Sequence, residues 1–156
     1  HSRSPPVYSM TETPRPASSV IIRRKDTFLL VRRANPPARA MYAFPGGKAE
    51  AGETAEQAAI RELKEETGLT TENVTLFSVY DLIDRNETGA VTSFYRLSVF
   101  LAEVDDRAIA KAADDADDLG WFTLADIARL NVPSSVRECA EALDRERRDT
   151  VAKEAH

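Results

Sequence analysis

The sequence has few of the side chains on which covalent catalysis depends. Cys139 is its single cysteine, so no internal disulfide can form, and its two histidines are His1 and His156. A lone cysteine in a charged segment is typical of a helix residue rather than a nucleophile. These absences argue against a Ser-His-Asp triad, a Cys-His pair, a histidine general base and a four-cysteine zinc site.

Long apolar runs and a basic charge excess are also missing. No run approaches the ~20 residues that a membrane-spanning helix needs, and no charged-then-apolar segment marks a secretion signal. We therefore expect a cytoplasmic protein with no membrane partner. The formal net charge of −5 argues against broad affinity for nucleic acid, although local arginine clusters suit a small anionic substrate.

Length and composition predict one globular domain. The 156 residues, 42% of them hydrophobic, give a modest core and leave no room for a second full domain. Residues 1–16 are rich in Ser, Pro and Thr without periodicity, so we expect them to be disordered. Met10 offers a natural start that would make residues 1–9 an expression remnant. The folded domain is expected over residues 17–150.

Residues 47–69, GKAEAGETAEQAAIRELKEETGL, form the most informative segment. Thr54 and Gln57 stand in the order of a capping box, and Gly68 suits a left-handed stop, so we expect a helix over residues 55–67. At about 100° per residue, acidic residues gather on one face of this helix and apolar residues on another. The acidic face consists of Glu62, Glu65 and Glu66.

This acidic face predicts a cation site. Like charges three and four residues apart destabilise an isolated helix by about 0.2–0.5 kcal/mol per pair, so their clustering calls for a compensating cation or open water. Ligands that are all oxygen favour Mg²⁺, or Mn²⁺ as a substitute. A solvated helix face is the alternative for an arbitrary acidic run.

Nine positions of the segment match the Nudix box, G-x5-E-x7-R-E-U-x-E-E-x-G-U, where U is a bulky aliphatic residue. They are Gly47, Glu53, Arg61, Glu62, Leu63, Glu65, Glu66, Gly68 and Leu69. The sequence thus resembles a Nudix hydrolase, and the chance of such a match in a chain of this length is on the order of 10⁻⁷. The resemblance implies an α/β protein with the Nudix fold, an α/β/α sandwich around a mixed β-sheet, and Mg²⁺-dependent cleavage of a pyrophosphate bond.

The resemblance also implies roles for the box residues. The metal ligands would be Glu62, Glu65, Glu66 and the main-chain oxygen of Gly47. Glu62 and Glu65 are the first candidates to orient or deprotonate the attacking water. Glu53 and Arg61 would form a charge pair that fixes the loop against the helix.

A second acidic run, residues 114–118, precedes Trp121. It resembles the G-D-D-A stretch of some ADP-ribose pyrophosphatase-like members, with Ala113 in place of the glycine. Asp115 is therefore a third catalytic candidate, and a solvated acidic loop is the alternative.

Substrate contacts are predicted ahead of the glycine turn, which consists of Pro45, Gly46 and Gly47. Arg33 and Arg39 carry guanidinium groups that can grip phosphate oxygens, with an ordinary exposed arginine as the alternative. Phe44 either stacks on a base or ribose or belongs to the core.

The remaining segments predict strands and helices on both sides of the box. Residues 18–33 read as a hairpin that turns at Lys25 and Asp26, and residues 74–84 and 91–104 as an antiparallel pair with its turn at residues 86–89. Trp121 and Phe122 suit a short final strand. Residues 124–130 suit a short helix, and residues 134–148 a longer one.

The leading hypothesis is an enzyme that splits ADP-ribose into AMP and ribose 5-phosphate. One alternative is a nucleotide-pool cleansing pyrophosphohydrolase that acts on a modified nucleoside triphosphate. The other is a non-enzymatic regulator that binds ADP-ribose, but the intact glutamates favour turnover, and the segment after the last predicted helix start is too short for a winged-helix DNA reader. The resemblance implies a small nucleotide diphosphate substrate and, as in many relatives, a homodimer.

Overall fold

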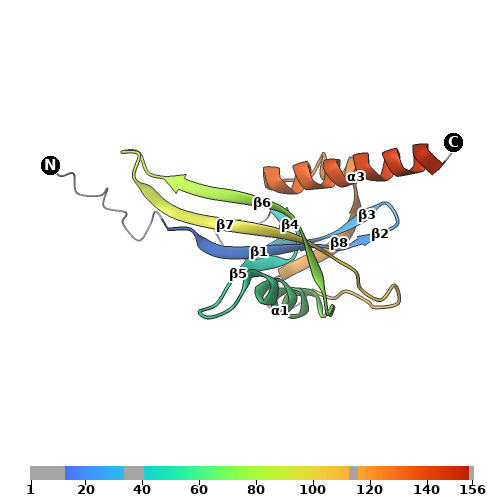
Figure 1. The fold of residues 1–156 in the computed structure, drawn as a ribbon, viewed down its shortest axis with the longest axis horizontal. Coiled ribbons are helices and arrows are strands. Elements are labelled where there is room, and N and C mark those ends of the chain that lie inside the picture. The colour runs from blue at the N-terminus through green and yellow to red at the C-terminus, as the bar shows by residue number, and fades with distance from the viewer. Residues whose placement is uncertain (1–12, 34–40, 113–115, 155–156) are drawn as a thin grey trace.

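The computed structural model describes residues 13–33, 41–112 and 116–154. Within these ranges the chain forms eight strands and three helices (Figure 1). They are β1 (Arg15–Ile21), β2 (Arg23–Arg24), β3 (Thr27–Arg33), β4 (Tyr42–Ala43), β5 (Gly46–Lys48), α1 (Ala55–Thr67), β6 (Val74–Arg85), β7 (Val91–Ala102), β8 (Ala116–Thr123), α2 (Leu124–Ile127) and α3 (Ser134–Glu154).

The strands form two four-stranded sheets. The first has the order β5-β1-β7-β6 and is mixed, because β1 runs antiparallel to β5 and parallel to β7. The second contains β2, β3 and β4, with β8 paired antiparallel to β3. Strand β5, which carries the glycine turn, therefore lies at an edge of the first sheet, next to α1.

Helices cover both sides of the strands, with α1 below them and α3 above in Figure 1. Successive residues of β1 contact opposite layers because side chains alternate across a strand. Val20 belongs to a buried cluster with Leu63 of α1, whereas Ile21 belongs to a cluster with Leu143 of α3. The α/β/α sandwich with a mixed sheet, expected from the resemblance, is confirmed.

Helix α1 begins and ends where its end signals predict. Thr54 and Gln57 form both hydrogen bonds of the capping box. Gly68 ends the helix in the left-handed conformation with φ 77°, and its N–H donates to the Lys64 carbonyl. The bounds Ala55–Thr67 equal the predicted ones.

The expected hairpin over residues 18–33 is wrong in its first half. The run divides into β1, which pairs with β7 in the first sheet, and the two-residue β2, which pairs with β3 in the second. Strand β1 also begins at Arg15, inside the segment expected to be disordered, because β7 supplies a parallel partner from that residue onward. Residues 1–12 lie outside the described ranges.

Three boundaries toward the C-terminus also differ from the prediction. Strand β8 starts at Ala116 rather than Trp121, since β3 pairs with it along its whole length. Helix α2 is only four residues long, and α3 continues to Glu154, beyond the predicted end near residue 148. The pair β6 and β7 matches its prediction to within two residues, with a turn in which the Asn86 carboxamide accepts from Thr88 N–H. Among the helices in the described ranges, none has the length and apolar character needed to cross a bilayer.

Candidate active site

The predicted acidic face of α1 is present, and its three glutamates differ in solvent exposure. Glu66 is buried, at 6% exposure, whereas the Glu62 side chain is 18% exposed and the Glu65 side chain 54%. All three lie on the part of α1 that approaches the glycine turn or the solvent beside it. The face therefore runs from the edge of the first sheet to open water.

Two glycines of the turn bring the main chain against these carboxylates. The Gly46 N–H donates to Glu66 Oε1 at 3.0 Å. A Cβ atom at Gly47 would lie 2.4 Å from Glu62 Oε2, closer than real Cβ contacts. A side chain at position 47 would displace the Glu62 carboxylate, so glycine there keeps Glu62 in its observed position.

Arg61 joins the loop before α1 to the acidic face. Its guanidinium binds Glu53 through two bonds, Nε to Oε2 at 2.7 Å and Nη2 to Oε1 at 2.9 Å. This is the charge pair predicted between loop and helix. The remaining nitrogen, Nη1, donates to Glu62 Oε1 at 2.6 Å and to Glu65 Oε2 at 3.1 Å.

The electrostatics of the site follow from these contacts. The hydrogen bonds from Arg61, followed by one from the Glu50 N–H, hold the pKa of Glu53 at about 2. The bond to Glu53 raises the pKa of Arg61 above its ordinary value, so the guanidinium stays charged. Burial raises the pKa of Glu62, although the neighbouring Arg61 acts in the opposite direction.

A model of the NUDIX domain family matches residues 13–143. The chain belongs to the Nudix family. It is therefore a hydrolase that acts on pyrophosphate bonds, as its pyrophosphatase relatives indicate.

Relatives differ in substrate while they share the Nudix domain. An ADP-ribose pyrophosphatase of Methanocaldococcus jannaschii is 38% identical over 123 residues, which are 79% of this chain and 70% of that protein. The mouse 8-oxo-dGDP phosphatase NUDT18 is 35% identical over 76% of this chain, which spans only 33% of the mouse protein. Among solved structures, a MutT Nudix hydrolase of Burkholderia pseudomallei has a TM-score of 0.71 at 30% identity and covers 83% of this chain and 98% of its own.

Nudix hydrolases generally use divalent metal ions, and the donor groups of the acidic face and the glycine turn fit one. Carboxylate and main-chain oxygens are the donors that Mg²⁺ and Mn²⁺ prefer. Within the described ranges no three acidic, histidine or cysteine side chains are already grouped around one point. Arg61 Nη1 contacts both Glu62 and Glu65. The guanidinium thus supplies positive charge to two of the expected metal ligands. An ion that replaced this one contact would leave the bond pair to Glu53 in place.

The described ranges leave out the side chains of three other predicted site residues. Arg39 and Asp115 lie outside the described residues. The main chain of Arg33 belongs to β3 and pairs with Ala116, but its side chain is also outside the description. Phe44 is 4% exposed, and its ring centre lies 6.4 Å from that of Phe28. Phe44 therefore lies in the core, which was the alternative to stacking on the substrate.

A groove beside β5 contains residues that were not predicted from the sequence. It has a volume of about 620 Å³, and its lining includes Arg15, Lys48 and Tyr95. Lys48 Nζ lies 5.2 Å and Arg15 Cζ 5.9 Å from the centre of the Tyr95 ring. Parallel pairing of β1 with β7 sets Arg15 opposite Tyr95, a contact that no local pattern indicates. A larger groove of about 930 Å³ near residues 70–73 has none of the three box glutamates in its lining.

Proposed function

We propose that this Nudix protein hydrolyses ADP-ribose, or a closely similar nucleoside diphosphate linked to a second group, to AMP and ribose 5-phosphate with Mg²⁺. The observation that carries the proposal is the 38% identity to an ADP-ribose pyrophosphatase over 70% of that relative's length. The mixed acidic and main-chain oxygen donors at the glycine turn support a divalent ion as cofactor, with Mn²⁺ as a substitute.

In the proposed reaction the chain holds the ion with Glu62, Glu65, Glu66 and the main-chain oxygen of Gly47. When bound, Mg²⁺ supplies polarisation of a phosphoryl oxygen, a steadied leaving group and a more acidic water. Glu62 or Glu65 orients or deprotonates the water, because no histidine lies within the described ranges. Asp115 remains a third candidate for this role.

Binding of the substrate is proposed along the groove beside β5. Lys48 directly follows Gly47, and together with Arg15 it offers positive charge for phosphate oxygens. The Tyr95 ring, which lies close to both cations, gives a face on which a base or ribose can stack. Arg33 and Arg39 are proposed as further contacts to the phosphates.

A second candidate is cleavage of an oxidised guanine nucleotide. The mouse relative named as an 8-oxo-dGDP phosphatase, 35% identical over 123 residues, favours this reading. A regulator that only binds ADP-ribose is less well supported, because Glu62, Glu65 and Glu66 are all retained and a binder needs no complete set of ligands.

A substrate panel tests the proposal. The purified chain is incubated with Mg²⁺ and, separately, ADP-ribose, 8-oxo-dGDP or 8-oxo-dGTP, and the products are separated by ion-exchange chromatography. We expect the highest kcat/KM for ADP-ribose, equal amounts of AMP and ribose 5-phosphate, and no turnover in EDTA. Preference for an 8-oxo nucleotide would select the second candidate, and tight binding of ADP-ribose without turnover would select the regulator.

A further inference from the structure

Ser18 of β1 carries a buried hydroxyl that has no hydrogen-bond partner among the described residues. The residue is 1% exposed, and its Oγ is one of two buried side-chain atoms in this condition. A hydroxyl that is removed from water without a partner destabilises the fold, so most buried polar groups are paired. The position of Ser18 therefore requires an explanation beyond packing.

Strand register directs this hydroxyl toward the acidic face of α1. Ser18 pairs with Gly47 of β5, and residues directly opposite in an antiparallel pair share one face of the sheet. A Cβ atom at Gly47 would meet Glu62 Oε2, so this face looks toward Glu62. Val20, two residues along β1, packs with Leu63 of α1 and fixes the same direction.

We propose that Ser18 is a positioning residue of the metal site, whose hydroxyl donates to the Glu62 carboxylate, directly or through one ordered water, when an ion is bound. Glu62 Oε1 accepts a hydrogen bond from Arg61, whereas Oε2 lies next to Gly47, the residue that pairs with Ser18. An ion that takes over the Arg61 contact leaves the carboxylate in need of a second partner to fix its orientation. The inference rests on the metal dependence in the proposed function.

A role in the site and a role in the fold predict opposite results for Ser18→Ala. If the hydroxyl serves only the ion-bound site, its removal deletes an unpaired buried group, and the melting temperature without metal stays the same or rises. Metal affinity falls by about 10- to 100-fold, as is typical when a partner of a metal ligand is removed. Ser19→Ala is the matched control, since Ser19 is also buried but faces the α3 side with Ile21.

The experiment measures Mn²⁺ binding to the full chain without substrate, from the electron paramagnetic resonance signal of free Mn²⁺, and melting temperatures in EDTA. We expect weaker binding for Ser18→Ala alone, with no loss of melting temperature. Binding within about twofold of wild type, or a lowered melting temperature accompanying weaker binding, overturns the role of Ser18 and leaves the proposed function standing. A wild-type chain that takes up no Mn²⁺ overturns both the metal dependence and the role of Ser18.

Discussion

At the scale of single residues, the two glycines of the turn are required for different reasons. A Cβ at Gly46 would lie 2.0 Å from the Ser18 carbonyl oxygen, which belongs to the main chain of β1 and cannot move freely. A Cβ at Gly47 would instead meet the end of the Glu62 side chain, which can rotate away. Gly46 therefore protects the pairing of β5 with β1, while Gly47 protects the position of a predicted metal ligand.

Alanine at these two positions should separate stability from activity. Gly46→Ala is expected to lower the free energy of unfolding by about 1–3 kcal/mol, as overpacking does. Gly47→Ala is expected to keep the wild-type melting temperature and to lower kcat/KM at least about tenfold, because Glu62 is displaced. Thermal melts and hydrolysis assays on both variants check this. Full activity in Gly47→Ala would contradict the role given to Glu62.

The half-exposed Glu65 gives a direct test of the ligand assignment. Glu65→Gln is expected to lower turnover at least about 10²-fold, because a metal-dependent step loses several kcal/mol of charge stabilisation. The fold should persist, since the side chain is 54% exposed. Glu56→Gln, an exposed change in the first turn of the same helix, is the matched control and should leave kcat unchanged. Equal rates in the two variants would rule out Glu65 as a ligand.

At the scale of elements, local signals predicted α1 and the β6–β7 pair well. The ends of α1 depend on Thr54, Gln57 and Gly68, all within or next to the helix, so the sequence contains the whole signal. The turn between β6 and β7 is likewise local, because Asn86 bonds to residues two and four positions ahead. The pair of Arg61 with Glu53 was implied by the resemblance of one short segment to the Nudix box, and the structure contains this pair.

Elements and contacts that depend on distant partners were not predictable in this way. Strand β8 begins in an acidic run, and it is β3 that makes this run a strand. The split between β1 and β2 is decided by which sheet each joins. The groove that contains Arg15 and Tyr95 exists because β1 and β7 pair in parallel, and side-chain alternation alone does not choose a partner strand.

The charge pair of Arg61 with Glu53, which joins the loop to α1, makes part of the folding stability depend on pH. The pKa of Glu53 is about 2 in the folded chain against an ordinary value of 4.5, so its stabilisation is complete above pH 4.5 and is lost as the pH falls toward 2. Between pH 6 and pH 3 the melting temperature of wild type should fall further than that of Glu53→Gln, which has no proton to take up. The two melting temperatures should run parallel from pH 6 to pH 8. If the melting temperatures of wild type and Glu53→Gln ran parallel down to pH 3, the charge pair of Arg61 with Glu53 would not stabilise the fold.

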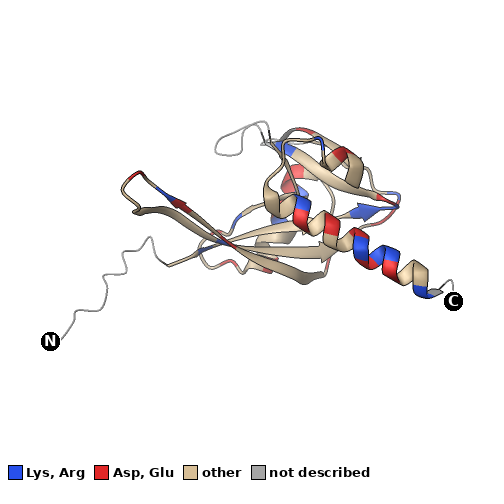
Figure 2. Cartoon of the chain, turned by 90° about the horizontal axis from the view of Figure 1, so that it is seen from above, with Lys and Arg blue, Asp and Glu red and all other residues tan. Residues whose placement is uncertain are grey.

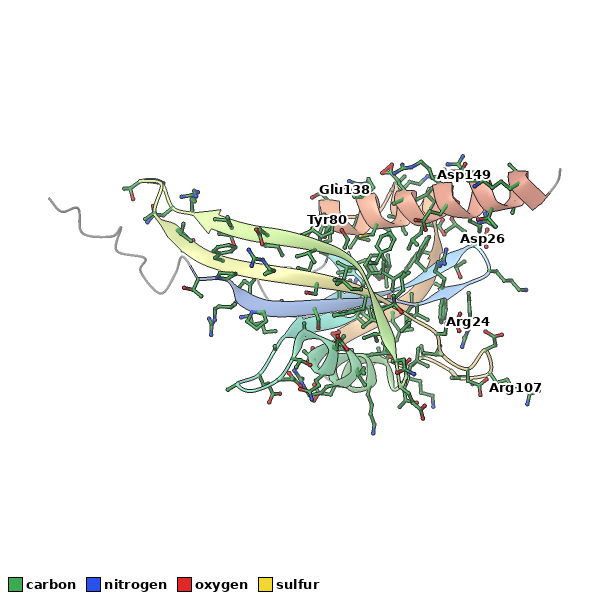
Figure 3. All side chains as sticks on the ribbon, viewed as in Figure 1. Arg24, Asp26, Tyr80, Arg107, Glu138 and Asp149 are labelled. Atoms are coloured by element: carbon green, nitrogen blue, oxygen red, sulfur yellow. The ribbon has the colours of Figure 1, made fainter. Side chains whose placement is uncertain are left out.

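At the scale of the whole molecule, one buried cluster joins both sheets to α3. It contains Ile21 of the first sheet, Leu30 of the second and Leu143 of α3. Tyr80 of β6 also reaches this helix, with its hydroxyl 3.4 Å from Cys139 Sγ (Figure 3). The match to the Nudix family ends at Leu143, and residues 145–153 of α3 are exposed and carry charges of both signs (Figure 2). The helix thus covers the core with its first half only.

Two substitutions by alanine, one in each half of α3, test this division of the helix. Leu143→Ala removes a side chain that is 1% exposed and should lower the free energy of unfolding by about 2–5 kcal/mol, through lost burial and the cavity left behind. Val151→Ala, in the same helix but 57% exposed, should change it by less than about 0.5 kcal/mol. Urea unfolding followed by circular dichroism gives both values. If α3 unfolded separately from the strands, Leu143→Ala would shift only a minor first transition and leave the main urea midpoint unchanged. A single transition at a lower urea concentration is therefore the result that shows α3 to unfold together with the two sheets.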